Sequence, residues 1–435
     1  MNPRDAGRRS GPAATLYRGS VVFLAIYVIG SGISFGVHLF AARALGATSY
    51  GYFVYATTWM AILLLGCNVG LKPTMIRFAA AYKARGEWGL LRGLARNATG
   101  WTIAASLVVT TASAIAIALL RPRPDELRQT LLLIALAMPF MALGEVWSSA
   151  VRGLGSAAKS QLPASIVQHT LLGITLIIVF QVSGMEGGAV SAAGSFLLAT
   201  TGALVAAGSL LRWELPSEVR ASPPRYHRRE WMSVAGGNAL ISFFQAARAP
   251  LVVVISGAYV DAQHIAFYVA GQRLANVVSL ALFGISGFAS PLISQYFALS
   301  DRSRLQRLAH LAARGALGGG MLIALVLASF GHQILRLFGE GFDTAYVPLL
   351  VLLFGELVAA ATGPVGFFLS MTGRQMTATR IEGVVSVVAL CLAVVLIPRY
   401  GILGSAIVVA ACSCLRNIAM FIAVWRYLGL RSAAF

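Results

Sequence analysis

Charged residues are scarce in this sequence. Asp, Glu, Lys and Arg make up only 11% of the 435 residues, whereas hydrophobic residues make up 58%. A soluble domain carries about 25% charged residues, because its surface must face water. The scarcity argues against a soluble protein, including a large soluble helical bundle, because the helices of such a bundle would need polar faces that this sequence lacks.

Cysteine and lysine are also rare. All four cysteines lie in apolar stretches, and Cys412 and Cys414, two positions apart, would not face each other on one helix, so we expect no disulfide framework. Lysine occurs three times, and the net charge of +19 comes mainly from arginines near the ends of apolar stretches. Basic residues at such positions set the orientation of a membrane protein, and we expect no nucleic-acid partner.

Sequence motifs typical of enzymes are absent as well. The chain contains no HExxH, no GxSxG, no phosphate-binding GxxxxGK(S/T) and no metal-spaced set of Cys and His. No connection between apolar stretches is long enough to form a folded domain that could present catalytic residues. We therefore predict that the protein is not an enzyme and that it binds neither a metal nor a cofactor.

Apolar stretches of about 20 residues, separated by polar connections, fill most of the chain. A helix of this length spans a hydrocarbon layer ~30 Å thick, and a helix satisfies its own backbone polar groups in lipid. We predict an all-α membrane protein with about twelve transmembrane helices. The predicted spans are residues 19–43, 50–70, 98–120, 129–151, 163–183, 188–211, 233–257, 264–291, 308–330, 346–370, 379–397 and 402–426.

The distribution of Lys and Arg predicts the orientation of these spans. Twenty-five of the 34 basic residues fall in connections on one side, six fall on the other side, and three lie within spans. Cytoplasmic connections carry the excess of basic residues, so we predict a multi-pass protein of the bacterial inner membrane with both termini in the cytoplasm. The first apolar stretch is too long for a signal-peptide core, and we expect it to be retained.

The chain is predicted to divide into two similar halves. Residues 1–215 would form an N-terminal six-helix bundle, residues 216–232 a cytoplasmic linker and residues 233–435 a C-terminal six-helix bundle. The second span begins with YFVYA at residues 52–56, and the eighth begins with FYVAG at residues 267–271. Two six-helix repeats around a central cavity are a common plan of secondary transporters.

The first span of each half carries a polar stripe. The spacings of three and four residues place each stripe on one helical face, which predicts that the stripes line the cavity. His38 could instead form a packing hydrogen bond. The candidate cavity residues from these stripes are Ser34, His38, Asn238, Ser242 and Gln245.

Three arginines lie within the predicted spans. Arg248 falls about 14 residues into the seventh span, where a charged side chain costs at least ~2.5–3.5 kcal/mol and should face protein or a wet cavity. Arg273 lies on a polar face of the eighth span with Gln272 and Asn276. We predict that Arg248 and Arg273 contact the substrate, although each could also reach the outer interface. Arg416 is a weaker candidate of the same kind.

Two carboxylates also lie within spans, Glu145 in the fourth and Glu356 in the tenth. A carboxyl group at membrane depth can carry a proton at neutral pH, so both are candidates for coupling transport to a proton or sodium ion. Each could equally form a static ion pair with a buried arginine. Glu382 begins the eleventh span, where the helix N-terminus favours an anion, and we predict a structural role for it.

Short motifs along nearly the whole chain resemble one transporter family. Residues 42–46 read ARALG, residues 50–53 read YGYF, residues 85–87 read RGE and residues 291–294 read PLIS. Together they resemble the polysaccharide transporter branch of the multidrug/oligosaccharidyl-lipid/polysaccharide exporter superfamily, which contains the O-antigen and oligosaccharide flippases. The chain departs from this family after Arg248, where Ala249 and Pro250 replace the usual hydrophobic residue and Asp.

The resemblance implies a flippase that moves a polyprenyl-pyrophosphate-linked oligosaccharide across the inner membrane by alternating access, for surface polysaccharides such as lipopolysaccharide. It implies that Arg248 contacts a phosphate or an acidic sugar with Arg273 as its helper, and that a polymerase and glycosyltransferases are partners. The alternatives are a multidrug/cation antiporter of the same superfamily, a flippase for peptidoglycan precursors, a membrane enzyme of polysaccharide assembly and a scaffold without transport activity.

Overall fold

The computed structural model describes residues 12–68, 70–182 and 188–430, and within these ranges the chain contains helices and no strands. The N-terminal part contains α1 (Pro12–Asn68), α2 (Leu71–Arg85), α3 (Trp88–Leu120), α4 (Asp125–Gly153), α5 (Ala157–Leu162), the π-helical turn η2 (Pro163–Val167), α6 (Gln168–Ile177), η3 (Ile178–Val182), α7 (Ala189–Glu214) and α8 (Ser217–Ala221). The remainder contains α9 (Arg228–Ala246), α10 (Arg248–Ser256), α11 (Ala262–Ala298), α12 (Arg302–Arg336), the 3₁₀ turn η4 (Phe342–Ala345), α13 (Tyr346–Thr362), α14 (Val365–Met371) and α15 (Gln375–Leu428).

By length and composition, the described helices are sufficient for about twelve membrane crossings. In the described part of the chain, nine helices are long and apolar enough to cross a membrane, and the pair α9 and α10, bent by 53°, makes ten. The 57 residues of α1 and the 54 residues of α15 are each long enough to cross twice, because one crossing needs ~20 residues. The predicted all-α membrane fold is therefore confirmed.

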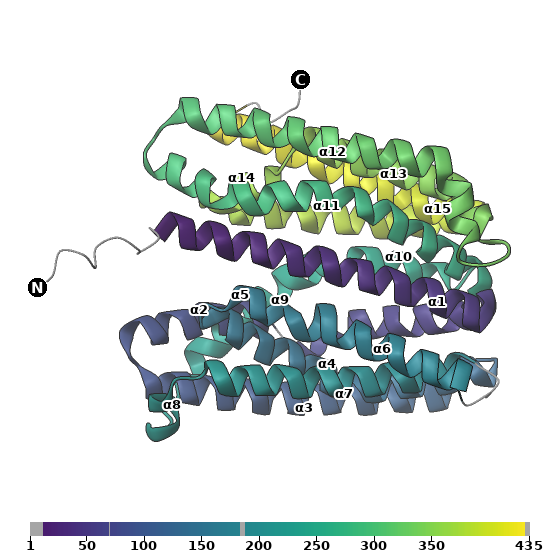
Figure 1. Ribbon diagram of the computed structural model, residues 1–435, viewed down its shortest axis with the longest axis horizontal. Coiled ribbons are helices and arrows are strands. Elements are labelled where there is room, and N and C mark those ends of the chain that lie inside the picture. The colour runs from purple at the N-terminus through teal and green to yellow at the C-terminus, as the bar shows by residue number, and fades with distance from the viewer. Residues whose placement is uncertain (1–11, 69, 183–187, 431–435) are drawn as a thin grey trace, which may run out of the picture.

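Both long helices contain a glycine at the point where the sequence predicts a connection between spans. Gly46 in α1 has φ 73° and Gly401 in α15 has φ 55°. Residues other than glycine rarely adopt a positive φ. Figure 1 shows α1 running along the molecule and turning back at its far end. Two predicted spans are interrupted: the seventh between α9 and α10, at Ala247, and the tenth between α13 and α14, at Gly363 and Pro364.

The helices are arranged in two layers. In Figure 1, α2 to α7 form the lower layer and α11 to α15 form the upper layer, with the first part of α1 between them. α1 packs against α11 of the upper layer and against α4 of the lower layer. α9 contacts α2, whereas α10 packs against α15, so the bent pair contacts both layers.

The predicted linker is ordered and packs on the lower layer. The backbone N–H of Arg225 donates to the carbonyl of Gly89 at 2.9 Å, and Arg92 donates to the carbonyls of Arg220 and Ser222. The buried indole N–H of Trp231, at the start of α9, donates to the hydroxyl of Tyr82 in α2 at 2.9 Å. The linker therefore follows the surface of the N-terminal half rather than bridging the two layers freely.

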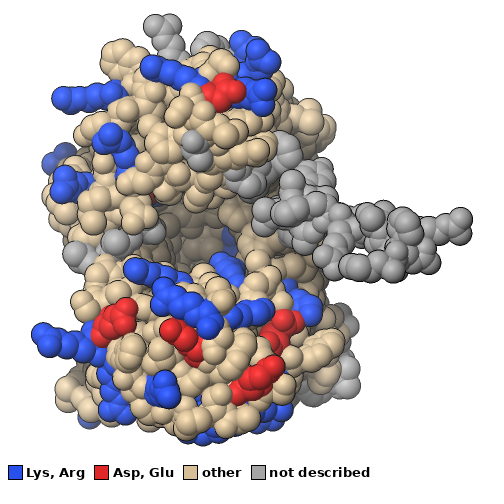
Figure 2. All heavy atoms as spheres, turned by 90° about the vertical axis from the view of Figure 1, so that its left-hand side faces the viewer, with Lys and Arg blue, Asp and Glu red and all other residues tan. Residues whose placement is uncertain are grey.

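The two ends of the molecule differ. Figure 2 shows the face that carries α2 and α8, where a hollow separates the two layers and Lys and Arg side chains lie on both sides of it. At the opposite end, aromatic side chains close the gap: the ring centroids of Tyr50 and Phe342 are 6.3 Å apart, and those of Phe35 and Phe338 are 5.5 Å apart. Gly51 contacts α11 so closely that a Cβ atom there would overlap the carbonyl of Ala262. The structure is therefore open at one end and closed at the other.

Candidate functional site

A chamber of about 680 Å³ lies between the layers, with α1 on one side and α11 on another. The polar stripe predicted on the first span lines it, because residues three and four apart on α1 share one face. No Asp or Glu is among the described residues that line the chamber. Its polar lining consists of Tyr27, Ser31, Ser34, His38, Thr57, Ser165, Gln168, His169, Arg273, Asn276 and Ser279.

Arg273 is the arginine that lines this chamber. Its Nε atom is buried without a hydrogen-bond partner, and no carboxylate of the described residues lies within 4.0 Å of its guanidinium. His38, His169 and Tyr50 lie within electrostatic range of it. Arg273 is partly buried, and a guanidinium that is partly removed from water is costly without an anion, so this site carries an uncompensated positive charge that an anionic ligand would stabilise.

His38 lines the chamber and also packs within the protein. Its Nδ1 atom is 3.3 Å from the hydroxyl of Tyr50, and both side chains are buried. His38 therefore takes both positions that the sequence left open, one at the wall of the cavity and one in a packing contact within the protein. This contact links the chamber to the closed end of the molecule, where Tyr50 packs against Phe342.

Two further pockets adjoin the chamber. A pocket of about 350 Å³, which we call the N-pocket, lies in the lower layer and shares Met141, Ala164 and Gln168 with the chamber. A pocket of about 520 Å³ lies against the upper layer and shares Tyr27 and Ser279 with it. Because lining residues are shared, the three spaces are neighbours.

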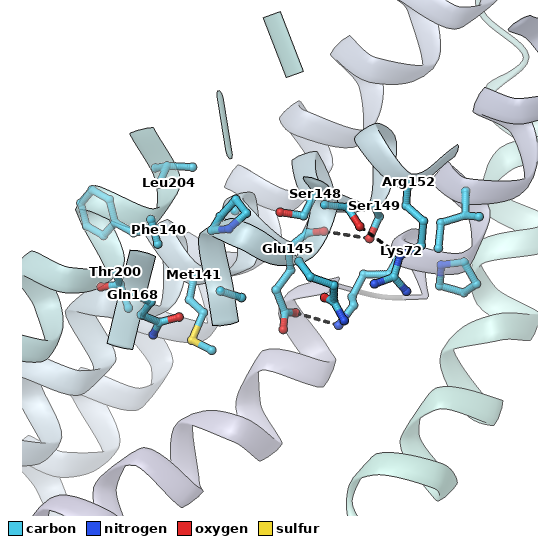
Figure 3. A pocket seen from close by; sticks show the side chains of 18 of the residues that line it. Lys72, Phe140, Met141, Glu145, Ser148, Ser149, Arg152, Gln168, Thr200 and Leu204 are labelled. Atoms are coloured by element: carbon cyan, nitrogen blue, oxygen red, sulfur yellow. Dashed lines mark hydrogen bonds and ion pairs between the residues drawn. The ribbon is translucent and has the colours of Figure 1, made fainter. Parts of the chain in front are cut away.

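Glu145 lies in the N-pocket and is paired with a lysine (Figure 3). Its Oε2 atom is 3.2 Å from Nζ of Lys72 and accepts a hydrogen bond from Nδ2 of Asn68 at 2.6 Å. The possible pairing of Glu145 with a buried arginine is therefore wrong. Sequence reasoning missed Lys72 because it lies at the start of α2, beyond the end of the second span.

A cluster of charged side chains lies in the C-terminal half. Glu382 bridges two arginines: Oε2 is 3.6 Å from Nη1 of Arg248, and Oε1 is 3.6 Å from Nη1 of Arg416. Glu356 lies within electrostatic range of both arginines, beyond 4.0 Å. Glu382 lies seven residues into α15, so its environment is this cluster and not the helix N-terminus.

Arg248 and Arg273, which were predicted to contact the substrate together, lie in different surroundings. Arg248 lines neither the chamber nor the two adjoining pockets, and its charge is compensated by Glu382. Arg273, predicted as a helper, is the arginine that faces the chamber. Arg416 lines the pocket beside the upper layer together with Glu382.

The polar stripe of α9 faces the lower layer. Nδ2 of Asn238 donates to Oγ1 of Thr74 in α2 at 3.2 Å, and Ser242 lines the N-pocket. Gln245 lies in α9, and its side chain is outside the described residues. Sequence reasoning missed two lining residues of the fifth span, Gln168 and His169, although an adjacent polar pair in an apolar stretch is a recognisable signal.

The sequence comparison identifies the family. Residues 16–297, well over half of the chain, match the family described as polysaccharide biosynthesis protein. The chain belongs to this family. No protein of curated function matches the sequence significantly.

Solved structures show the same fold at low sequence identity. The lipid II flippase MurJ in an inward closed conformation has a TM-score of 0.74 and 13% identity, covering 93% of this chain and 87% of that chain. A multidrug resistance MATE family transporter of the MOP superfamily has a TM-score of 0.72 in its inward-facing conformation, with 14% identity and coverage of 94% and 98%. An outward-facing MATE structure scores 0.62, with 15% identity and coverage of 95% and 96%. The chain is thus a multi-pass membrane protein with this transporter fold.

Proposed function

We propose that this protein is a flippase that carries a polyprenyl-pyrophosphate-linked oligosaccharide across the inner membrane for surface polysaccharide biosynthesis. Family membership and fold support a membrane protein of polysaccharide assembly. The observation that carries the proposal is the uncompensated Arg273 in a chamber without described acidic residues. A pyrophosphate supplies the negative charge that this arginine lacks, and arginine binds phosphate oxygens through paired donors.

The shape of the structure supports alternating access. The hollow opens on the face rich in Lys and Arg, which is cytoplasmic by the distribution of basic residues, and the other end is closed by aromatic packing. A lipid-linked sugar could enter this chamber from the cytoplasmic side while its tail stays in the bilayer. Rocking of residues 1–215 against residues 233–435 would then open the other end, and both termini would stay in the cytoplasm.

Glu356 is the stronger of the two candidates for a coupling ion. Glu145 is held by Lys72 and Asn68, whereas among described residues no Lys, Arg or His nitrogen lies within 4.0 Å of the Glu356 carboxyl group. A proton or a sodium ion bound there would change the charge balance with Arg248 and Arg416, which lie nearby. The state of the C-terminal half would thereby depend on the ion.

Replacing Arg273 tests the proposed function. In proteoliposomes that contain a fluorescent polyprenyl-pyrophosphate oligosaccharide, we expect Arg273→Ala to lower the translocation rate at least about tenfold, since a hydrogen bond to a charged group contributes ~1.5–3 kcal/mol. Arg273→Lys should retain part of the rate because it keeps the charge. Arg85→Ala, which changes an arginine whose side chain is 68% exposed at the end of α2, is the matched control.

Two results would contradict the proposal. Translocation by Arg273→Ala at the wild-type rate would remove Arg273 from the substrate site. Loss of the gene that left surface polysaccharide intact and raised sensitivity to cationic drugs would favour a multidrug/cation antiporter.

A further inference from the structure

The N-pocket has a positive charge that the proposed function does not use. Its lining contains two cations, Lys72 and Arg152, and one carboxylate, Glu145. Figure 3 shows Lys72 and Arg152 toward one side of the pocket and Phe140 and Leu204 toward the other. The pocket therefore has a basic side and an apolar side.

Arg152 supplies the unbalanced charge. Lys72 is paired with Glu145 at 3.2 Å, and Glu214, the nearby carboxylate at the end of α7, is paired with Lys159 at 2.6 Å. The contacts of Arg152 are neutral: its Nε donates to Oγ of Ser160 at 3.3 Å, and its guanidinium lies 5.6 Å from the ring centre of Phe23. No carboxylate of the described residues lies within 4.0 Å of it. Its full charge is thus available to a ligand.

The rest of the lining suits a sugar. Hydroxyl and amide groups offer both donors and acceptors, and the apolar side offers a surface for the C–H face of a ring. The volume of about 350 Å³ lies at the lower end of the ~300–1,000 Å³ of small-molecule sites, so the pocket fits a small part of a substrate. The neutral polar residues that line it are Ser148, Ser149, Ser160, Gln161, Gln168, Thr200 and Ser242.

The N-pocket and the chamber are adjacent. Met141, Ala164 and Gln168 line both spaces, so the N-pocket of Arg152 and the chamber of Arg273 lie on either side of these three residues. The two uncompensated arginines lie in different spaces, which indicates two separate anionic groups on the ligand. A lipid-linked oligosaccharide has one such group in its pyrophosphate, and an acidic sugar would supply the second.

We propose that the N-pocket is a subsite for an acidic sugar of the carried glycan, whose carboxylate binds Arg152 while the pyrophosphate binds Arg273. This inference rests on the proposed flippase function and narrows its substrate class to acidic oligosaccharides. Both arginines are proposed to bind an anion. Probes that carry or lack the sugar carboxylate can distinguish whether Arg152 binds the glycan or the lipid pyrophosphate.

The experiment uses two probes that differ in one group. Both are short-chain polyprenyl-pyrophosphate disaccharides, and the outer sugar is glucuronic acid in one and glucose in the other. Binding to the purified full-length protein in detergent micelles is measured by isothermal titration calorimetry. The wild type should bind the acidic probe about tenfold or more tightly, because a charged hydrogen bond contributes ~1.5–3 kcal/mol in a partly buried site.

Variants separate the two arginines. Arg152→Gln should reduce the ratio of the two Kd values about tenfold, and Arg152→Lys should retain part of the preference. Arg273→Ala should weaken both probes by a similar factor, because both carry the pyrophosphate. Arg85→Gln, a change in α2 at a side chain that is 68% exposed, should leave the ratio as in the wild type. Thermal unfolding of each variant checks that it is folded. If Arg152→Gln is not folded, Arg152→Lys tests the site.

The outcomes distinguish the inference from the function on which it rests. Equal wild-type affinity for both probes, or equal weakening of both by Arg152→Gln, would overturn the acidic-sugar subsite and leave the flippase proposal standing. Failure of the wild type to bind either probe would overturn the flippase proposal and the subsite together.

Discussion

Glu382→Ala should destabilise the protein by about 3–5 kcal/mol, the cost of removing one partner from a buried ion pair. Glu382 is 8% exposed and is the carboxylate nearest to both Arg248 and Arg416. Its removal would leave two guanidinium groups in an apolar environment with only the more distant Glu356 to balance them. The measurement is thermal unfolding of the purified protein in detergent micelles.

The single arginine variants provide the comparison. Arg248→Ala and Arg416→Ala each leave Glu382 paired with the remaining arginine, so we expect roughly half the loss seen for Glu382→Ala, or less. Asp125→Ala removes the carboxylate of an exposed pair with Arg128, which contributes about 0–1 kcal/mol, and serves as the control. A Glu382→Ala variant as stable as Arg248→Ala would show that Glu382 does not hold the cluster together.

Gly51→Ala should prevent the end of the molecule near Gly51 from closing. A Cβ atom at Gly51 would overlap the backbone carbonyl of Ala262, and backbone cannot move aside as a flexible side chain can. Overpacking of this kind costs about 1–3 kcal/mol, which shifts the balance between the two access states by roughly fivefold to 150-fold toward the state open at that end. Transport should slow accordingly, because one of the two states becomes hard to reach.

Cysteine labelling reports the shift. The four native cysteines are replaced, Ser34→Cys is introduced in the chamber, and a membrane-impermeant maleimide is applied from each side of the membrane. The parent should label from the cytoplasmic side, and Gly51→Ala from the outer side. Gly36→Ala is the matched control, since a Cβ atom at Gly36 meets nothing within 4 Å. Alanine favours helix in both cases, so unchanged labelling in Gly51→Ala would contradict the proposed closure.

The sequence predicted the fold because the fold follows from local properties. Apolar length sets each span, and the breaks in α1 and α15 fall at Gly46 and Gly401, in connections that the sequence marks. The polar stripe of α1 was also predictable, since spacing alone places Ser34 and His38 on one face. None of these features requires knowledge of which helices are neighbours.

The charge pairs could not be predicted in this way. Lys72 meets Glu145, and Glu382 meets Arg248, only because helices distant in sequence pack side by side. The sequence showed that Arg248 and Arg273 lie within predicted spans, and the packing decided which of them had a carboxylate partner. Whether a charged side chain has a partner depends on tertiary packing. The sequence predicted Arg248 as the main substrate contact and Arg273 as its helper, but Glu382 pairs with Arg248 and Arg273 lines the chamber.

The charged cluster of the C-terminal half also has an electrical consequence. Arginine stays protonated in proteins, and Glu356 is the carboxyl group of this cluster that we propose as the site of a coupling ion. With Glu356 and Glu382 both ionised, the cluster has no net charge, and its displacement across the bilayer would transfer no charge. One bound proton would make it monovalent, and a unit charge crossing 100 mV changes the free energy by ~2.3 kcal/mol. The occupancy of a single carboxyl would thus decide whether reorientation of this half responds to the membrane voltage.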